Sequence, residues 1–295
     1  MNNEELAYLA DLASVVADGV TICTHPRAVS AFFDNLSEER LAEICDGYAT
    51  KDKESLYVAI NVCLKTGRLP SKAMMSDIAD NVKKHCKSEF YKDEYIDTIK
   101  LPNVKNGDLT LAYATYAKDE IFQYDMPLVD PPALRLGYFD EDVSFPAIYE
   151  GNMPWVSACP SEINSMSGSL SEVSGKVLVL GLGLGYYPFI ASQKSNVREI
   201  TIVEINSGII DIFTRYVLPQ FPMKQKIKIV CADAIKYMAS VKKGEYDYCF
   251  ADIWEGAEDG ADRYIAIKKY EAQLHGTKFS YWIEDEIKRY LGDEI

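Results

Sequence analysis

Histidine, the commonest metal ligand in proteins, is rare in this sequence, where it accounts for only three of the 295 residues. Its seven cysteines are widely scattered and include no CxxC pair, which a zinc site or a redox motif would use. We therefore expect reduced thiols and no metal site.

No run approaches the roughly 18 uninterrupted apolar residues of a membrane span. Acidic residues occupy the start of the chain, where a secretory signal carries basic ones. These absences predict a cytoplasmic protein without membrane contact.

Clusters of basic residues are also missing from this sequence. The formal net charge is -14 and no Lys/Arg-rich run offsets it locally, so the phosphate backbone of a nucleic acid would be repelled. We expect a small molecule or another protein as the partner, and no nucleic acid. The remaining composition is that of an ordered globular protein, because 48% of the residues are apolar and can bury a sizeable core.

The chain divides into three segments by its patterns. Residues 1–130 have mainly helical periodicity, interrupted by Pro, Gly and Asn, and predict an α-helical N-terminal domain that is a candidate surface for a homo-oligomer. Residues 131–175 predict a β hairpin and a linker helix. In this segment the runs 134–139 and 145–151 alternate around an acidic turn, and a short helix follows from about Ser161. Residues 176–295 form the third segment.

In residues 176–295, strand and helix patterns alternate. Apolar runs predict strands at 177–180, 200–203, 227–231 and 246–251. The first run is apolar throughout, as expected for a parallel strand buried on both faces. Helical patterns lie between the strands, at about 187–193, 207–217 and 234–241. This order predicts an α/β fold with a Rossmann-like doubly wound sheet, whose ligands bind at the carboxyl ends of the strands.

Three glycines follow the first of these strands and come directly before a helix. Gly181, Gly183 and Gly185 allow a tight turn and a close approach of the backbone to a ligand. The free amides at the start of the helix favour an anionic group such as a carboxylate. A tight strand-to-helix turn without a ligand explains the same glycines, so the pattern alone leaves both interpretations open.

Acidic residues follow the second and third strands. Glu204 lies about 23 residues after the first glycine, where a carboxylate accepts hydrogen bonds from both hydroxyls of an unphosphorylated ribose. Asp233 can accept the exocyclic amine of an adenine, while the backbone amide of Ala234 meets a ring nitrogen. The simpler alternatives are a solvated loop acid for Glu204 and a helix N-cap for Asp233.

An acidic and aromatic loop follows the fourth strand. We expect Asp252, Trp254 and Glu255 to face the reacting end of the ligand and take these three residues as catalytic candidates. An aromatic wall and two carboxylates suit a cationic centre, through cation–π and Coulomb attraction. The alternative is a tryptophan that anchors the loop beside solvated acids.

Four motifs occur in the order and spacing of one known family. They are VLVLGLGLGYY at 177–187, IVEIN at 202–206, CADA at 231–234 and FADIWEG at 250–256. Together they resemble the class I S-adenosylmethionine-dependent methyltransferases. The preceding hairpin and the SEINSM helix resemble more narrowly their spermidine-synthase-like branch. The resemblance covers about residues 155–254, and nothing in residues 1–130 belongs to it.

The resemblance implies S-adenosylmethionine as the cofactor and assigns the site residues to its parts. The methionyl part would lie on Gly181, Gly183 and Gly185, the ribose on Glu204, the adenine on Asp233 and Ala234, and the sulfonium and acceptor near Asp252. Methyl transfer needs mainly an aligned acceptor and a site that excludes water. The expected activity is methyl transfer to a small, amine-bearing acceptor, and the helical domain either covers that acceptor or mediates self-association.

Departures from the family leave two other functions open. Gly256 replaces the proline expected in this loop of an aminopropyltransferase, and the glycine turn lacks the acidic residue of that activity. Aminopropyl transfer is therefore the alternative activity, and a non-catalytic S-adenosylmethionine-binding or adaptor protein is the alternative to an enzyme. Tyr186 replaces the third glycine of the dinucleotide fingerprint, which argues against a nicotinamide or flavin enzyme.

Overall fold

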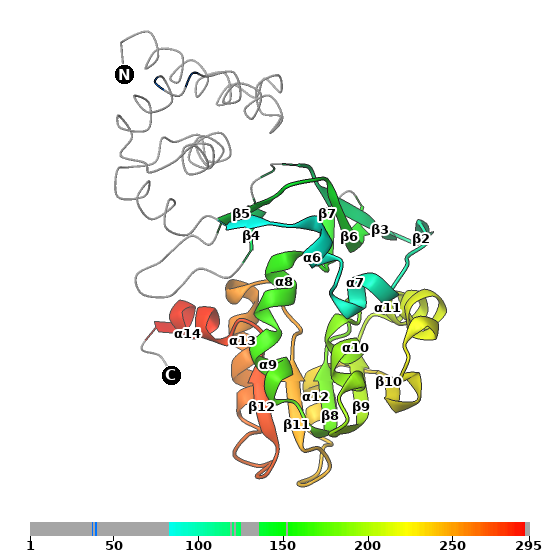
Figure 1. Cartoon of the computed structure of the whole chain (residues 1–295). Coiled ribbons are helices and arrows are strands. Elements are labelled where there is room, and N and C mark those ends of the chain that lie inside the picture. The colour runs from blue at the N-terminus through cyan, green and yellow to red at the C-terminus, as the bar shows by residue number, and fades with distance from the viewer. Residues whose placement is uncertain are drawn as a thin grey trace. The chain divides into compact units, whose positions relative to one another are not determined.

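The computed structural model describes residues 83–118, 120, 122–124, 136–151 and 153–292, together with Ser37 and Glu39. Its contacts divide the chain into two compact units, residues 1–90 with 115–143 and residues 91–114 with 144–295. Figure 1 labels their helices and strands. Most of the predicted helical domain lies outside the described residues. The division also differs from the three predicted segments, because residues 91–114 and 144–175 belong to the same unit as the predicted sheet.

The described part of the first unit contains a small three-stranded sheet. Across the sheet its strands are β1 (Lys83–His85), β5 (Leu136–Phe139) and β4 (Phe122–Gln123), with β1 parallel and β4 antiparallel to β5. The short helix α6 (Lys87–Phe90) follows β1. The ring of His85 lies 5.1 to 5.6 Å from the rings of Phe122, Tyr124 and Phe139, so one aromatic cluster connects the strands.

The helical prediction is wrong over residues 109–114, which belong to a strand. In the second unit, β2 (Val104–Asn106) and β3 (Leu109–Tyr116) pair as an antiparallel hairpin around Gly107, whose φ of 64° suits the turn. The sequence of β3, LTLAYATY, alternates between more and less buried residues with a period of two, which the helical interpretation missed. The segment before it does contain a helix, α7 (Glu94–Thr98).

A β hairpin does lie between residues 131 and 175, but not the one predicted. β6 (Val143–Glu150) pairs with β7 (Met153–Ser157) across Gly151, whereas residues 136–139 belong to the other sheet as β5. Pro154 made the β7 sequence resemble a loop. β7 lies at the edge of a sheet ordered β2-β3-β6-β7, and an edge strand tolerates proline. The predicted linker helix is the pair α8 (Pro160–Ser165) and α9 (Ser167–Glu172).

The second unit also contains a five-stranded parallel sheet, which confirms the predicted Rossmann-like α/β fold. In spatial order its strands are β10 (Ile227–Cys231), β9 (Val197–Glu204), β8 (Gly175–Leu180), β11 (Tyr248–Ala251) and β12 (Lys278–Tyr281). All four predicted strands are present, and residues 177–180 are buried as their apolar sequence predicts. β12 escaped prediction because it is short, contains Lys278 and Ser280, and is only partly buried at the sheet edge.

Helices cover both faces of the parallel sheet. α10 (Tyr186–Gln193) and α11 (Ser207–Ile212) connect the strands on one side of β8, and α12 (Ala234–Met238) and α13 (Ala257–Lys268) lead to the strands on its other side. Because parallel crossovers are right-handed, the two pairs lie on opposite faces. Figure 1 shows α10 in front of the strands and α12 and α13 behind them. The sheet is therefore doubly wound. A last helix, α14 (Glu284–Leu291), packs against α13.

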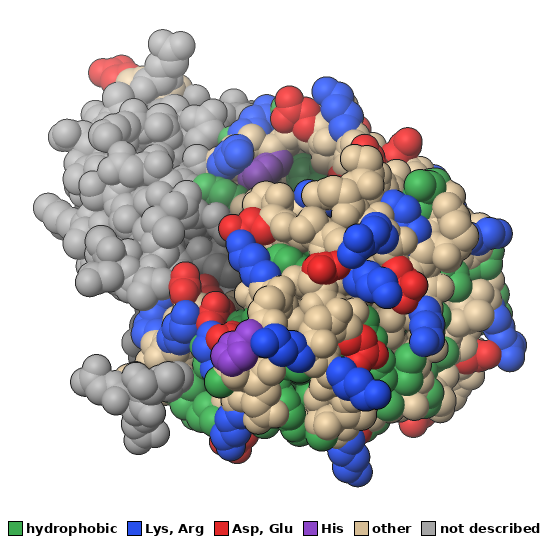
Figure 2. Space-filling model, turned by 90° about the horizontal axis from the view of Figure 1, so that it is seen from below, with side chains coloured by type: hydrophobic (Ala, Val, Ile, Leu, Met, Phe, Trp, Pro, Cys, Tyr) green, Lys and Arg blue, Asp and Glu red, His purple; other side chains and the backbone are tan. Residues whose placement is uncertain are grey.

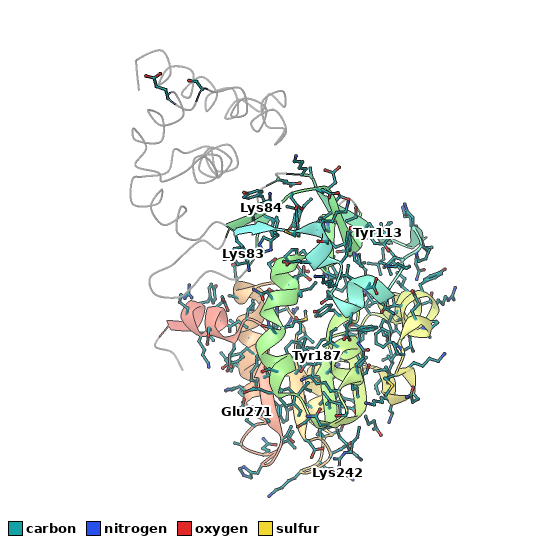
Figure 3. All side chains as sticks on the ribbon, viewed as in Figure 1. Lys83, Lys84, Tyr113, Tyr187, Lys242 and Glu271 are labelled. Atoms are coloured by element: carbon teal, nitrogen blue, oxygen red, sulfur yellow. The ribbon has the colours of Figure 1, made fainter. Side chains whose placement is uncertain are left out.

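Aromatic contacts fix the helices on the sheet. Tyr187 of α10, labelled in Figure 3, stacks on Phe250 of β11 with ring centroids 3.9 Å apart, and its hydroxyl lies 2.8 Å from Ser169 Oγ of α9. At the amino ends of the strands the surface carries charges of both signs (Figure 2), including an ion pair of 2.7 Å between Arg198 and Asp247. No helix in the described part of the chain is long and apolar enough to cross a membrane.

The aromatic cluster of the first unit predicts a pH-dependent stability. Burial, and then the charge of Lys83, lower the pKa of His85 from 6.5 to about 4, and its Nε2 has no hydrogen-bond partner among the described residues. The unfolded chain therefore binds a proton more readily than the folded one, and stability is lost as the pH falls from about 6.5 to about 4. We expect the melting temperature to fall over this range, and His85→Phe to reduce the fall. Thermal denaturation at several pH values checks this, and an unchanged pH dependence in the variant contradicts it.

Candidate functional site

One cavity at the carboxyl ends of the parallel strands contains almost all of the predicted site residues. Its volume is about 450 Å³, which lies within the range of small-molecule sites. The predicted residues that line it are Gly181, Gly183, Glu204, Asp233, Ala234, Asp252, Trp254 and Glu255. Gly185 lies beside it and lines a smaller pocket of about 30 Å³. The sequence therefore predicted which residues meet in space, while the role of each residue stays a prediction.

The glycine loop requires glycine at its first and third positions for different reasons. Gly181 has a φ of 95°, and a Cβ there would collide with the backbone oxygen of Asp252. Gly185 has a φ of 79° at the N-cap of α10, and a Cβ there would collide with the ring of Phe213. Gly185 thus allows close packing of the helix start, whereas Gly181 and Gly183 border the cavity directly.

Residues of α7 and its N-cap form hydrogen bonds with the glycine loop and with the start of α10. The hydroxyl of the fully buried Tyr95 donates a hydrogen bond of 2.7 Å to the carbonyl oxygen of Leu184. The hydroxyl of Tyr186 donates one of 2.8 Å to Asp93, and Asp93 caps α7 by accepting two backbone amides. Sequence analysis missed this support, because the residues lie about 90 positions apart and α7 carries no recognisable motif.

Glu204 is a buried carboxylate that connects two loops of the site. Its Oε2 accepts the amide of Leu182 at 3.0 Å, and its Oε1 accepts the amide of Asn206 at 2.7 Å. The side chain is only 7% exposed, so the alternative of a solvated loop acid is wrong. A carboxylate oxygen accepts more than one hydrogen bond, so both oxygens keep capacity for hydroxyl donors of a ligand.

Asp233 is the N-cap that the sequence offered as one interpretation, and it also lies in the cavity lining. Its Oδ1 accepts the amide of Lys236 at 2.9 Å and caps α12, and the residue also lines the cavity. Ala234 is buried next to it. Two isoleucines that the sequence analysis did not single out, Ile205 and Ile235, line the same part of the cavity, and Ile205 is 66% exposed. This part of the site thus offers apolar surface beside a carboxylate.

A second carboxyl group, that of Glu162, lines the same cavity as Asp252. The Asp252 carboxylate has no hydrogen-bond partner among the described residues; burial, and then the negative charge of Glu162, raise its pKa to about 8. Glu162 of α8 accepts hydrogen bonds from the amide and the hydroxyl of Ser157, the latter at 3.0 Å. Burial also raises the pKa of Glu162. Sequence analysis missed Glu162, although it lies in the SEINSM helix that carries part of the family resemblance.

All three tryptophans of the chain line this cavity, and each uses its indole N–H elsewhere. Trp155 donates to Glu255 at 3.0 Å, Trp254 to the carbonyl oxygen of Trp282 at 3.2 Å, and Trp282 to Ser165 at 2.8 Å. Trp254 therefore anchors its loop, as the simpler alternative proposed, and also borders the site. The tryptophans contribute ring surface to the cavity rather than hydrogen-bond donors.

The cavity lining is strongly acidic. Its carboxyl groups belong to Glu162, Glu204, Asp233, Asp252 and Glu255. Arg263 is the cationic side chain in the lining that the structure describes, and it already donates to Asp259 and to the carbonyl oxygen of Ile253. The site therefore favours a ligand with positive charge. No group of three His, Cys, Asp or Glu residues in the described ranges is arranged to hold a metal ion.

The stretch of the chain that contains most of the cavity lining is similar to a known family domain. Residues 159–269 match the family model of the spermine/spermidine synthase domain. This stretch is less than half of the chain, and it resembles that family domain. A putative O-methyltransferase from Klebsiella pneumoniae is a structural match at 15% identity and a TM-score of 0.26, over 32% of this chain and 43% of that chain, less than half its length. Among curated proteins none matches.

The packing of Gly185 leads to a test with a matched control. Gly185→Ala places a methyl group in the left-handed region and against Phe213, whereas Gly244 has nearly the same φ, 78°, and open space around it. We expect Gly244→Ala to cost about 1 kcal/mol of unfolding free energy, and Gly185→Ala about 2 to 4 kcal/mol, because overpacking adds to the backbone cost. Urea denaturation measures both. Equal losses would contradict the packing role.

Proposed function

We propose that the chain is an S-adenosylmethionine-dependent methyltransferase that acts on a small, amine-bearing acceptor. The observation that carries this proposal is an acidic cavity at the carboxyl ends of β8, β9, β10 and β11, lined by the loops of all four family motifs. The acceptor, the absence of a nucleic acid partner and the cytoplasmic location stay predictions from the sequence.

The residues present fit the parts of S-adenosylmethionine. Glu204 keeps acceptor capacity for the ribose hydroxyls, and it holds the loop that contains Gly181 and Gly183. Asp233 offers an acceptor for an adenine amine, and Ile205 and Ile235 of the same lining offer apolar surface for the ring. The negative charge near Asp252 suits the sulfonium. The cavity volume is also sufficient for a nucleoside of this kind.

When bound, S-adenosylmethionine would supply a methyl group on a cationic sulfur. The chain's own residues would then orient the acceptor and exclude water, which is most of what such a displacement requires. Trp155, Trp254 and Trp282 supply the rings that exclude water. An ammonium acceptor must lose a proton before it reacts, and the ionised Asp252 carboxylate, which lines the cavity without a hydrogen-bond donor among the described residues, is suited to receive that proton.

Aminopropyl transfer is the second candidate, and two observations favour it. Residues 159–269 match the spermine/spermidine synthase domain. In the described lining, the cation Arg263 is already paired, so a ligand without a carboxylate, such as decarboxylated S-adenosylmethionine, fits the acidic cavity well. The departures at Gly256 and in the glycine turn favour methyl transfer as the first candidate.

Ligand binding and product mass separate these functions. Isothermal titration with S-adenosylmethionine, its decarboxylated form and NAD ranks the three ligands. Incubation of the preferred ligand with a panel of primary amines, followed by mass spectrometry, distinguishes methylated from aminopropylated products. We expect S-adenosylmethionine to bind best and a methylated amine to form. Failure of both sulfonium ligands to bind would refute the proposal, and binding without any product would favour a non-catalytic role.

Substitution of Glu204 tests the ribose assignment. Glu204→Ala should weaken S-adenosylmethionine binding by about 1.5 to 3 kcal/mol, the range for losing a charge-assisted hydrogen bond. Glu199→Ala is the matched control, because Glu199 lies exposed on the same strand and away from the cavity. Calorimetry measures both affinities. Equal binding by the two variants would remove Glu204 from the ligand site.

A further inference from the structure

The cavity contains two carboxyl groups whose repulsion no described cation relieves. Glu162 reaches it from α8 and Asp252 from the loop after β11. Both also line the smaller pocket that continues along the glycine loop. Hydrogen bonds from Ser157 hold Glu162 in place, so it cannot turn away from Asp252 without losing them. The Asp252 carboxylate lines the cavity and has no hydrogen-bond donor among the described residues.

The other charged groups around the pair are already occupied. Glu204 of β9 binds the amides of Leu182 and Asn206, Asp233 caps α12, Glu255 accepts Trp155, and Arg263 of α13 is paired with Asp259. Tyr186 and Tyr187 of α10 line the smaller pocket, and burial raises the pKa of each, so they stay neutral. Two carboxyl groups that line one cavity in this way are most stable when one of them holds a proton or when the cavity receives a cation.

We propose that Glu162 is a positioning residue whose negative charge keeps Asp252 protonated in the free site, and that Asp252 releases this proton when a cationic group of the ligand enters the cavity. The proton passes to the solvent, and the positive charge of the ligand replaces it, so the charge of the site is balanced before and after binding. This inference rests on the proposed function, because it assumes a sulfonium or ammonium ligand. It adds Glu162, which none of the family motifs assigned.

The proposal predicts whether the affinity for a cationic ligand rises or falls with pH. The free site is protonated at neutral pH, because the pKa of Asp252 is raised to about 8, whereas the complex with a cation favours the ionised pair. Affinity for a cationic ligand must therefore rise with pH. Removal of the Glu162 charge lowers the pKa of Asp252 and moves this rise to lower pH. A purely structural role of Glu162 would change affinity without moving the pH dependence.

The experiment measures S-adenosylmethionine affinity by calorimetry in the full-length protein. For the unaltered chain, we expect affinity to increase about tenfold between about pH 6.5 and 8.5. For Glu162→Gln, we expect less than about a threefold increase over the same range. Glu258→Gln is the matched control, because Glu258 is an exposed acid outside the cavity lining, and it should keep the unaltered profile.

Two further ligands identify the cationic group. S-adenosylhomocysteine lacks the sulfonium charge but keeps the ammonium, and methylthioadenosine lacks both. A pH dependence with S-adenosylmethionine alone identifies the sulfonium, whereas one shared with S-adenosylhomocysteine identifies the ammonium. An equal pH dependence with all three ligands overturns the proposal.

The unaltered protein gives a second measurement, which covers the case that Glu162→Gln fails to fold. Calorimetry in two buffers of different ionisation enthalpy counts the protons released, and we expect about one per S-adenosylmethionine bound. Zero protons, or the same pH profile in Glu162→Gln as in the unaltered chain, overturns the inference while the proposed function stands. Absence of S-adenosylmethionine binding at every pH overturns both.

Discussion

The carboxylate of Glu204 is the interaction on which the arrangement of the site depends. Its two oxygens accept the amides of Leu182 and Asn206, and its backbone oxygen accepts the amide of Ala232. One residue thereby connects the loops that follow β8, β9 and β10. A buried carboxylate is stable only when such donors replace its hydration. The fold therefore supplies the donors, and the carboxylate in return fixes the loops that border the cavity.

The contrast between Glu204 and Asp252 shows how one fold treats two acids differently. Glu204 is satisfied by backbone amides, whereas the carboxylate of Asp252 meets no donor among the described residues and lines the same cavity as Glu162. A chain selected for stability alone would have no reason to keep the second arrangement. Ionisable groups in unfavourable surroundings concentrate at functional sites, since ligand binding can supply the missing compensation.

The sequence predicted the parallel sheet and the meeting of its strand ends because these features follow from local patterns. Apolar runs defined β8 to β11, and parallel topology then placed Glu204, Asp233 and Asp252 at one edge. Features that depend on contacts between distant segments could not be predicted in this way. Glu162 becomes a site residue only because α8 packs beside the loop after β11, and Pro154 hid the edge strand β7. The helical interpretation failed at β3 because its period-two pattern was missed.

The hydrogen bond from Tyr95 to Leu184 has a consequence for how this chain can be divided. A fragment starting at residue 176 would contain every glycine of the loop and every acid of the four motifs. It would lack α7, β7 and α8, and with them the hydroxyl that holds the loop, one of the three indole rings, and one carboxyl group of the pair. The smallest autonomous form of the candidate site must therefore include residues upstream of the sheet that the motifs identify.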